Sequence, residues 1–157
     1  MVQSLVVLAE RALSLADVER LVALHDPERP AVRVLVPGGG KRNVLVDVLD
    51  HLSLLELREA VEAVAGHTER TPGQAEADVR ATVSALQSMG CVASGDVVLA
   101  DPVSALDAEV RAGAEEVIIV TSPHAVEDTL HRDWASVARE RLGVPVLHVY
   151  ADSSWVG

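Results

Sequence analysis

The chain has 157 residues, of which 49% are apolar but only 2% are aromatic. This composition predicts one globular domain with an aliphatic core, and it excludes a disordered chain, a collagen and a coiled coil. The 24 acidic residues outnumber the 13 basic ones, so the net charge of -11 argues against nucleic-acid and anionic-membrane partners.

The first elements alternate between strand and helix. Residues 4–10 form a nearly continuous apolar run rich in β-branched side chains, which predicts a strand buried on both faces. Ser14, with Asp17 three residues later, resembles a capping box and predicts the start of a helix. That helix ends before Pro27, and residues 31–36 predict the second strand.

The connection that follows, residues 38–70, is long for an α/β unit. Apolar residues recur at helical spacing over 43–65, so this stretch is expected to be helical. Thr71 and Pro72 then match the N-cap and first position of a new helix, which we expect to end at Gly90.

The second half of the chain repeats the alternation. Residues 92–100 predict the third strand, and Asp101 followed by Pro102 predicts a capped helix that ends at Gly113. Residues 116–121, with the sequence EVIIVT, form the most strand-like run of the chain.

The last part predicts one more helix and one more strand. Residues 122–132 are polar and ambiguous, Asp133 is expected to cap a helix that ends at Gly143, and residues 144–150 predict the fifth strand. Strands that alternate with helices imply right-handed crossovers. We therefore predict a three-layer α/β/α sandwich with a five-stranded parallel sheet, in one domain that covers residues 1–157.

The candidate ligand site lies at the carboxyl ends of the strands, where open parallel sheets have their crevice. The candidate ligand-binding residues follow the predicted strands: Glu10, Arg11, Gly38, Gly39, Gly40, Lys41, Arg42, Thr121, Ser122, His124 and Arg132. Residues 38–42 place three glycines before two cations, including the only lysine of the chain, which is a possible anion nest. A flexible, solvated turn is the alternative interpretation, because the spacing does not match a nucleotide-hydrolase phosphate loop.

A second candidate lies in the polar segment after the fourth strand. His124, Asp128 and His131 recur at intervals of four and three residues, so on a helix they would share one face. Such a trio offers nitrogen and oxygen ligands to zinc or another divalent ion. The alternatives are a hydrogen-bonded brace for the loop and a site for an organic ligand or phosphate, and the residues alone leave all three interpretations open.

The other reactive residues suggest no catalytic machinery. Cys91 is alone, which excludes an internal disulfide and predicts a buried thiol in a cytoplasmic protein. We interpret His25, His51 and His67 as surface or half-buried residues, and His148 as a residue that could face a partner. Nucleophile-elbow, zinc-protease and dinucleotide-binding motifs do not occur in the sequence, and no apolar run reaches the ~18 residues of a membrane span.

The second half of the chain resembles the universal stress protein family. Residues 101–106 (DPVSAL) are similar to that family's helix start after the third strand. Residues 113–120 (GAEEVIIV) and 144–147 (VPVL) are similar to its fourth and fifth strands. The resemblance implies a strand order of 3-2-1-4-5 and a homodimer that pairs through the last strand, residues 144–150.

The resemblance does not extend to the family's ATP site. ATP-binding members have a glycine-rich motif after the fourth strand, whereas this chain has no glycine between Gly113 and Gly143. Glu10 corresponds to the family's adenine-contacting aspartate and is one methylene longer. The resemblance therefore implies a relative that binds no ATP and needs no cofactor.

Three functional hypotheses follow. The first is a non-enzymatic, dimeric sensor or interaction module that binds an unknown small molecule or anion at the strand ends. The second is a metal-dependent hydrolase that uses His124, Asp128 and His131. The third is a nucleotide-binding stress protein whose phosphate site is built from Lys41 and Arg42.

Overall fold

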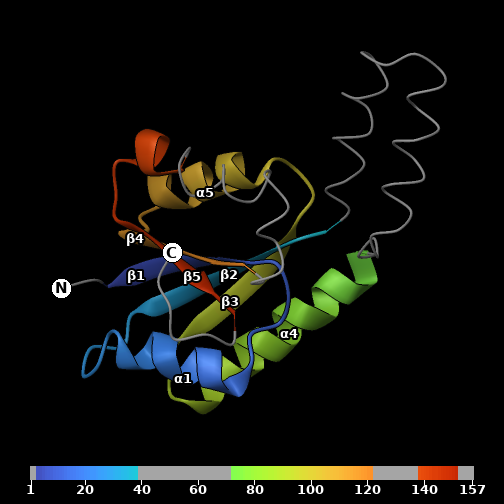
Figure 1. Cartoon of the computed structure of the whole chain (residues 1–157), viewed down its shortest axis with the longest axis vertical. Helices are drawn as coiled ribbons and strands as arrows, with labels where there is room; N and C mark the ends of the chain where they lie inside the picture. The colour runs from blue at the N-terminus through green and yellow to red at the C-terminus, as the bar shows by residue number, and fades with distance from the viewer. Residues whose placement is uncertain (1–2, 39–71, 122–137, 152–157) are drawn as a thin grey trace.

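The computed structural model describes residues 3–38, 72–121 and 138–151 and shows a parallel sheet (Figure 1). Its strands are β1 (Ser4–Ala9), β2 (Ala31–Pro37), β3 (Ala93–Val98), β4 (Glu116–Thr121) and β5 (Val146–Tyr150). They are hydrogen-bonded in the order β3-β2-β1-β4-β5, and every pair is parallel. The predicted fold class and strand order are confirmed.

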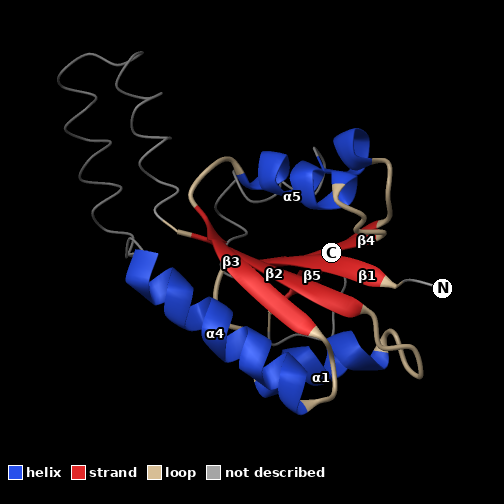
Figure 2. Ribbon diagram, turned by 180° about the vertical axis from the view of Figure 1, so that it is seen from behind, coloured by secondary structure: helices blue, strands red, loops and turns tan. Residues whose placement is uncertain are grey.

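Helices cover both faces of the sheet. The described helices are α1 (Leu15–Ala23), α4 (Pro72–Ser88) and α5 (Pro102–Arg111). Helices α1 and α4 lie on one face, and α5 lies on the other with a short helical segment at residues 138–142 (Figure 2). This arrangement is the predicted three-layer sandwich. No helix among the described residues is both long and apolar enough to cross a membrane.

The helix boundaries follow the predicted capping chemistry. The Ser14 hydroxyl accepts a hydrogen bond from the Asp17 backbone N–H at 3.2 Å, and the Asp101 carboxylate accepts one from the Ser104 N–H at 2.9 Å. Each cap satisfies an N–H group that has no partner within its own helix. Gly90 follows α4 with a φ of 84°, a conformation that glycine adopts without strain.

The last strand is shorter than predicted. Strand β5 begins at Val146, two positions after the predicted start at Val144. Pro145 explains the difference, because it has no N–H to donate to the ladder. Its carbonyl still accepts a hydrogen bond of 2.9 Å from the Val117 N–H, so Pro145 leads into the strand without belonging to it.

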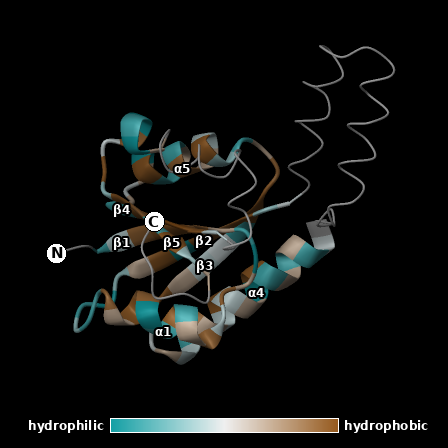
Figure 3. Cartoon of the chain, viewed as in Figure 1, coloured by the Kyte–Doolittle hydropathy of each residue, from teal (hydrophilic) through white to brown (hydrophobic). Residues whose placement is uncertain are grey.

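The core consists of two aliphatic layers, one on each face of the sheet. On the α1 and α4 face, strand residues such as Val7, Val34 and Ile118 are at most 1% exposed. On the α5 face, Leu8 and Ile119 pack with Leu106 of α5. Figure 3 shows a mostly hydrophobic sheet between helices that also carry hydrophilic residues. Each buried aliphatic side chain contributes about 1.5–3 kcal/mol to folding, so these layers account for a fold without phenylalanine.

Candidate functional site

The register of the sheet brings two predicted residues together at its carboxyl edge. Ala9 of β1 is the partner of Val120 in β4, and the Glu10 N–H continues this ladder by donating to the Val120 carbonyl at 3.3 Å. Ala9 and Val120 pack toward α1 and α4. Because side chains alternate along a strand, Glu10 and Thr121 both lie on the α5 face. Strand β1 lies between β2 and β4, so this is the point where the strand order reverses.

A buried histidine from the neighbouring strand completes this site. Leu147 and Val149 pack toward α1 and α4, so His148 between them also lies on the α5 face. Its Nε2 lies 2.7 Å from the Thr121 hydroxyl oxygen, and the two residues are 7% and 2% exposed. The His148 ring also packs against the Tyr150 ring, with centroids 5.0 Å apart. We call Glu10, Thr121 and His148 the carboxyl-edge cluster.

The electrostatics of the cluster favour a neutral imidazole. Burial lowers the pKa of His148 from its ordinary value of 6.5, and the nearby charge of Arg139 lowers it further. The Glu10 carboxylate opposes this effect without cancelling it. A neutral ring has one donor and one acceptor nitrogen, and a hydroxyl can donate or accept, so either tautomer satisfies the pair. The cluster therefore combines neutral hydrogen-bonding groups with one carboxylate.

The remaining described candidates lie apart from the cluster. Arg11 is exposed after β1. Gly38 is buried at the end of β2, where its N–H donates to the Val98 carbonyl at 2.9 Å. A Cβ at Gly38 would collide with Val97 of β3 and press against Ala75 of α4. Gly38 therefore permits close packing of β2, β3 and α4, and its N–H is already engaged.

The other candidates lie outside the described residues. They are Gly39, Gly40, Lys41, Arg42, Ser122, His124, Asp128, His131 and Arg132. The predicted anion nest, metal trio and helical connection at 38–70 therefore stay predictions. Within the part of the chain that the structure describes, no group of three His, Cys, Asp or Glu residues could hold a metal ion.

A second histidine has partners that the sequence did not indicate. His25 follows α1, and its Nδ1 lies 3.0 Å from the Leu21 carbonyl oxygen. Its Nε2 lies 2.9 Å from a carboxylate oxygen of Glu116, the first residue of β4. Burial alone would lower the pKa of His25, but the hydrogen bonds to Glu116 and Leu21 outweigh it and raise the pKa above 6.5. No local pattern could identify this pair, because its members are 91 residues apart.

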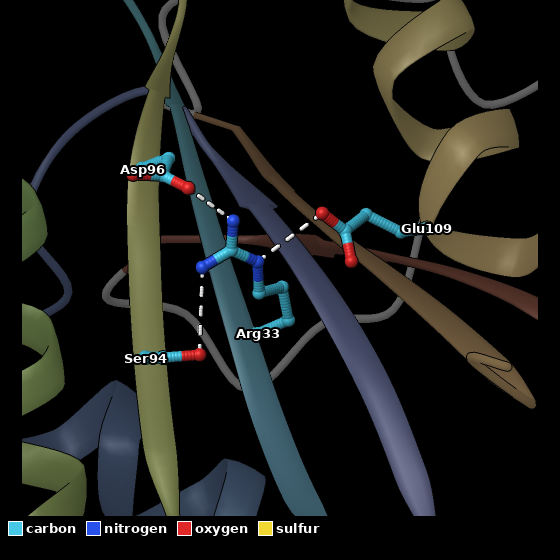
Figure 4. A network of polar contacts seen from close by, with 4 residues as sticks. All are labelled: Arg33, Ser94, Asp96 and Glu109. Atoms are coloured by element: carbon cyan, nitrogen blue, oxygen red, sulfur yellow. Dashed lines mark hydrogen bonds and ion pairs between the residues drawn. The ribbon is translucent and has the colours of Figure 1, made fainter. Parts of the chain in front are cut away.

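A third polar cluster lies toward the β3 edge of the α5 face (Figure 4). The Arg33 guanidinium contacts Asp96 of β3, and its Nε donates to Glu109 of α5 at 3.1 Å. Nη1 of Arg33 donates to the Ser94 hydroxyl at 3.4 Å. Because the guanidinium is already paired with two carboxylates, we interpret this cluster as a clamp between β2, β3 and α5 and not as a ligand site.

The fold and the carboxyl-edge cluster define a class: an α/β protein with a doubly wound parallel sheet and a polar site where the strand order reverses. No protein-family model matches the sequence, and no curated protein matches it. The architecture and the chemistry of this site therefore carry the functional argument.

Proposed function

We propose that this protein is a non-enzymatic sensor or interaction module, similar to universal stress proteins, that binds a small molecule at the carboxyl edge of its sheet. The observation that carries this proposal is the convergence of Glu10, Thr121 and His148 where the strand order reverses. In open α/β sheets this position is the usual ligand crevice, because the helices diverge there from the strand ends.

The state of the cluster favours recognition over catalysis. Thr121 is 2% exposed, and its hydroxyl is hydrogen-bonded to His148. A nucleophile needs access to its substrate, whereas a buried hydroxyl and imidazole can orient the groups that contact a ligand. The protein would thus respond to a ligand by changes in stability or association, and we place it in the cytoplasm, where a single unpaired thiol stays reduced.

The test of this proposal is a search for the ligand. Native mass spectrometry of the protein purified without additives should reveal a small molecule that is released on denaturation. Thermal-shift measurements with inorganic phosphate, AMP and ATP then probe the anion and nucleotide alternatives. A ligand present at about 100 times its Kd should raise Tm by roughly 5 °C or more.

Matched variants connect any thermal shift to the site. Glu10→Gln changes the charge of the cluster at nearly constant shape and should reduce the ligand-induced shift. Asp96→Asn makes the same kind of change at the exposed β3 edge and should leave that shift intact. The proposal fails if no small molecule is released and no probe shifts Tm, or if both variants respond like the wild type.

We also propose that two copies associate through β5. This strand is the last in the order of the described sheet, and its sequence VLHVY carries no acidic residue, arginine or lysine. An uncharged edge strand presents unpaired backbone groups to a second copy. Light scattering should give twice the chain mass, and Val149→Lys should halve it. Ser94→Lys, on the opposite edge strand, is the control that should leave the mass unchanged.

A further inference from the structure

The segment between α1 and β2, residues 24–30, lies beside Cys91, the only cysteine of the chain, and shares a small cavity with it. His25, Glu28 and Arg29 line a small cavity together with Cys91, whose residue is 7% exposed. The Arg29 guanidinium lies so close to Gly90 that a Cβ there would collide with it. Residues of this segment therefore lie next to the buried Cys91 side chain.

The backbone contributes little to holding the segment. The Asp26 N–H makes a long contact of 3.4 Å with the Ala23 carbonyl, and the Ala31 N–H donates to the Gln3 carbonyl at 2.9 Å. Between these two points, residues 27–30 make no backbone-to-backbone hydrogen bond with any described residue. Two of these four residues are prolines, which have no N–H to donate. Side chains must therefore provide the attachment.

The surroundings of His25 require a charged ring. Its Nδ1 faces the Leu21 carbonyl oxygen at 3.0 Å, and a carbonyl oxygen only accepts hydrogen bonds. Its Nε2 faces the Glu116 carboxylate at 2.9 Å, and an ionised carboxylate also only accepts. Both nitrogens can donate only when the ring is an imidazolium, so loss of one proton must break one of the two contacts.

The charges around His25 act in the same direction. Glu116 faces the ring from β4, and Glu28 adds a second negative charge from the segment itself. Burial lowers the pKa of His25, but these groups and the Leu21 carbonyl raise it more, so the net direction is upward. Arg29 and Cys91 complete the titratable groups around the same cavity.

We propose that His25 is a pH-dependent latch, which in its protonated form holds residues 24–30 over Cys91 and which releases them when it loses a proton. The latch is closed below about pH 6.5 and opens as pH rises through the raised pKa of His25. A neutral ring has one proton for two acceptors, so one of the two contacts is lost and the segment is held less firmly. The cavity then opens, and the thiol becomes accessible.

Two substitutions separate the latch from other effects of pH. In Glu116→Gln, the amide N–H can donate to a deprotonated Nε2 while Nδ1–H stays on the Leu21 carbonyl, so the latch should stay closed at every pH. In His25→Leu both polar contacts are absent, so the latch should stay open. Glu115→Gln changes an exposed neighbour whose carboxylate accepts from the Gln3 N–H at 3.5 Å, and this variant should behave as the wild type.

The experiment measures alkylation of Cys91 by iodoacetamide in the full chain from about pH 6 to about pH 8.5, a range that spans histidine titration. Each rate is divided by the rate of the urea-unfolded chain at the same pH, which removes the intrinsic pH dependence of thiol alkylation. For the wild type and Glu115→Gln, the normalised rate should rise at least about fivefold with pH. It should stay low in Glu116→Gln and high in His25→Leu.

Two outcomes would overturn the latch. One is a normalised rate in Glu116→Gln that rises with pH as steeply as in the wild type. The other is full protection of Cys91 in His25→Leu at about pH 6, where the wild-type ring is charged. Nitrogen-15 NMR of the His25 ring provides an independent check, because both nitrogens should be protonated at that pH.

Discussion

The two ends of β4 each bind a histidine, but the pKa values of the two rings shift in opposite directions. At the amino end, Glu116 holds His25, and the side chains remain 17% and 10% exposed. At the carboxyl end, Thr121 holds His148, and the residues are 2% and 7% exposed. The first contact raises the pKa of its histidine, whereas burial at the second site lowers it.

The difference shows that a carboxylate partner can outweigh burial at His25, whereas burial and the charge of Arg139 prevail at His148. A carboxylate can only accept, so it stabilises an imidazolium, whereas a hydroxyl can donate or accept and so tolerates a neutral ring. The stability consequences have opposite signs. The His25 contribution is fully present below pH 6.5 and is lost as pH rises through its raised pKa. The His148 contribution is fully present above pH 6.5 and is lost as pH falls through its lowered pKa.

The largest effect should come from breaking the buried pair at the carboxyl end. Thr121→Val keeps the shape of the side chain but removes the hydroxyl that pairs with His148. An unsatisfied buried group costs about 1–3 kcal/mol, so the free energy of unfolding in urea should fall by that amount. Ser94→Ala removes an exposed hydroxyl as a control and should change it by about 0.5 kcal/mol or less. Equal losses in the two variants would contradict the assigned role of Thr121.

The acid side of the stability curve should depend on His148. As pH falls below 6.5, the unfolded chain binds a proton that the buried ring resists, so wild-type stability decreases. His148→Phe cannot titrate and should flatten this part of the curve, even though its absolute stability is lower. Urea unfolding at a series of pH values measures the slope. An unchanged acid slope would mean that His148 is not the group responsible.

The alkaline side should depend on His25. Wild-type stability should decrease as pH rises above 6.5, because the folded state then loses the proton that holds Glu116. His25→Gln should remove that decrease while leaving the acid slope of the wild type in place. The same series of urea measurements checks this result. If the variant still lost stability as pH rises, His25 would not be the group responsible for the alkaline decrease, and the contrast between the two ends of β4 would fail.

The smallest effect should come from an exposed ion pair. Asp96 contacts Arg33, but its side chain is 67% exposed. Solvent screens such a pair, so Asp96→Asn should change the free energy of unfolding by about 0.5 kcal/mol or less. The difference should shrink further at high salt. A loss as large as that of Thr121→Val would mean that the burial of a contact does not determine how much the contact contributes to stability.

Much of the fold could be predicted because local signals determined it. The caps at Ser14 and Asp101 and the apolar runs of β1 and β4 are visible in the sequence and appear in the structure as expected. The strand order came from the resemblance to a family and is confirmed. The apolar run at residues 144–150 predicted a longer strand than the observed β5. The run did not account for Pro145, which has no N–H to donate to the ladder.

The site could be predicted only in part, for a physical reason. The convergence of Glu10 and Thr121 follows from the rule that ligands bind where parallel strands end. The partners of the two histidines could not be predicted, since they depend on register and packing between distant segments. Thr121 and His148 are 27 residues apart, and His25 and Glu116 are 91 apart. Neither sequence separation matches the spacing of neighbouring residues on one helix or one strand, so no local pattern indicates these pairs.

The clamp at Arg33 has a consequence for assembly. It holds Asp96 on edge strand β3, where charge opposes the addition of another strand, whereas edge strand β5 carries no acidic residue, arginine or lysine. The two edge strands of the described sheet therefore differ in charge. If two copies pair through β5 as proposed, the charged β3 strands would lie at the two outer edges of the joined sheet, which would disfavour the addition of a third copy.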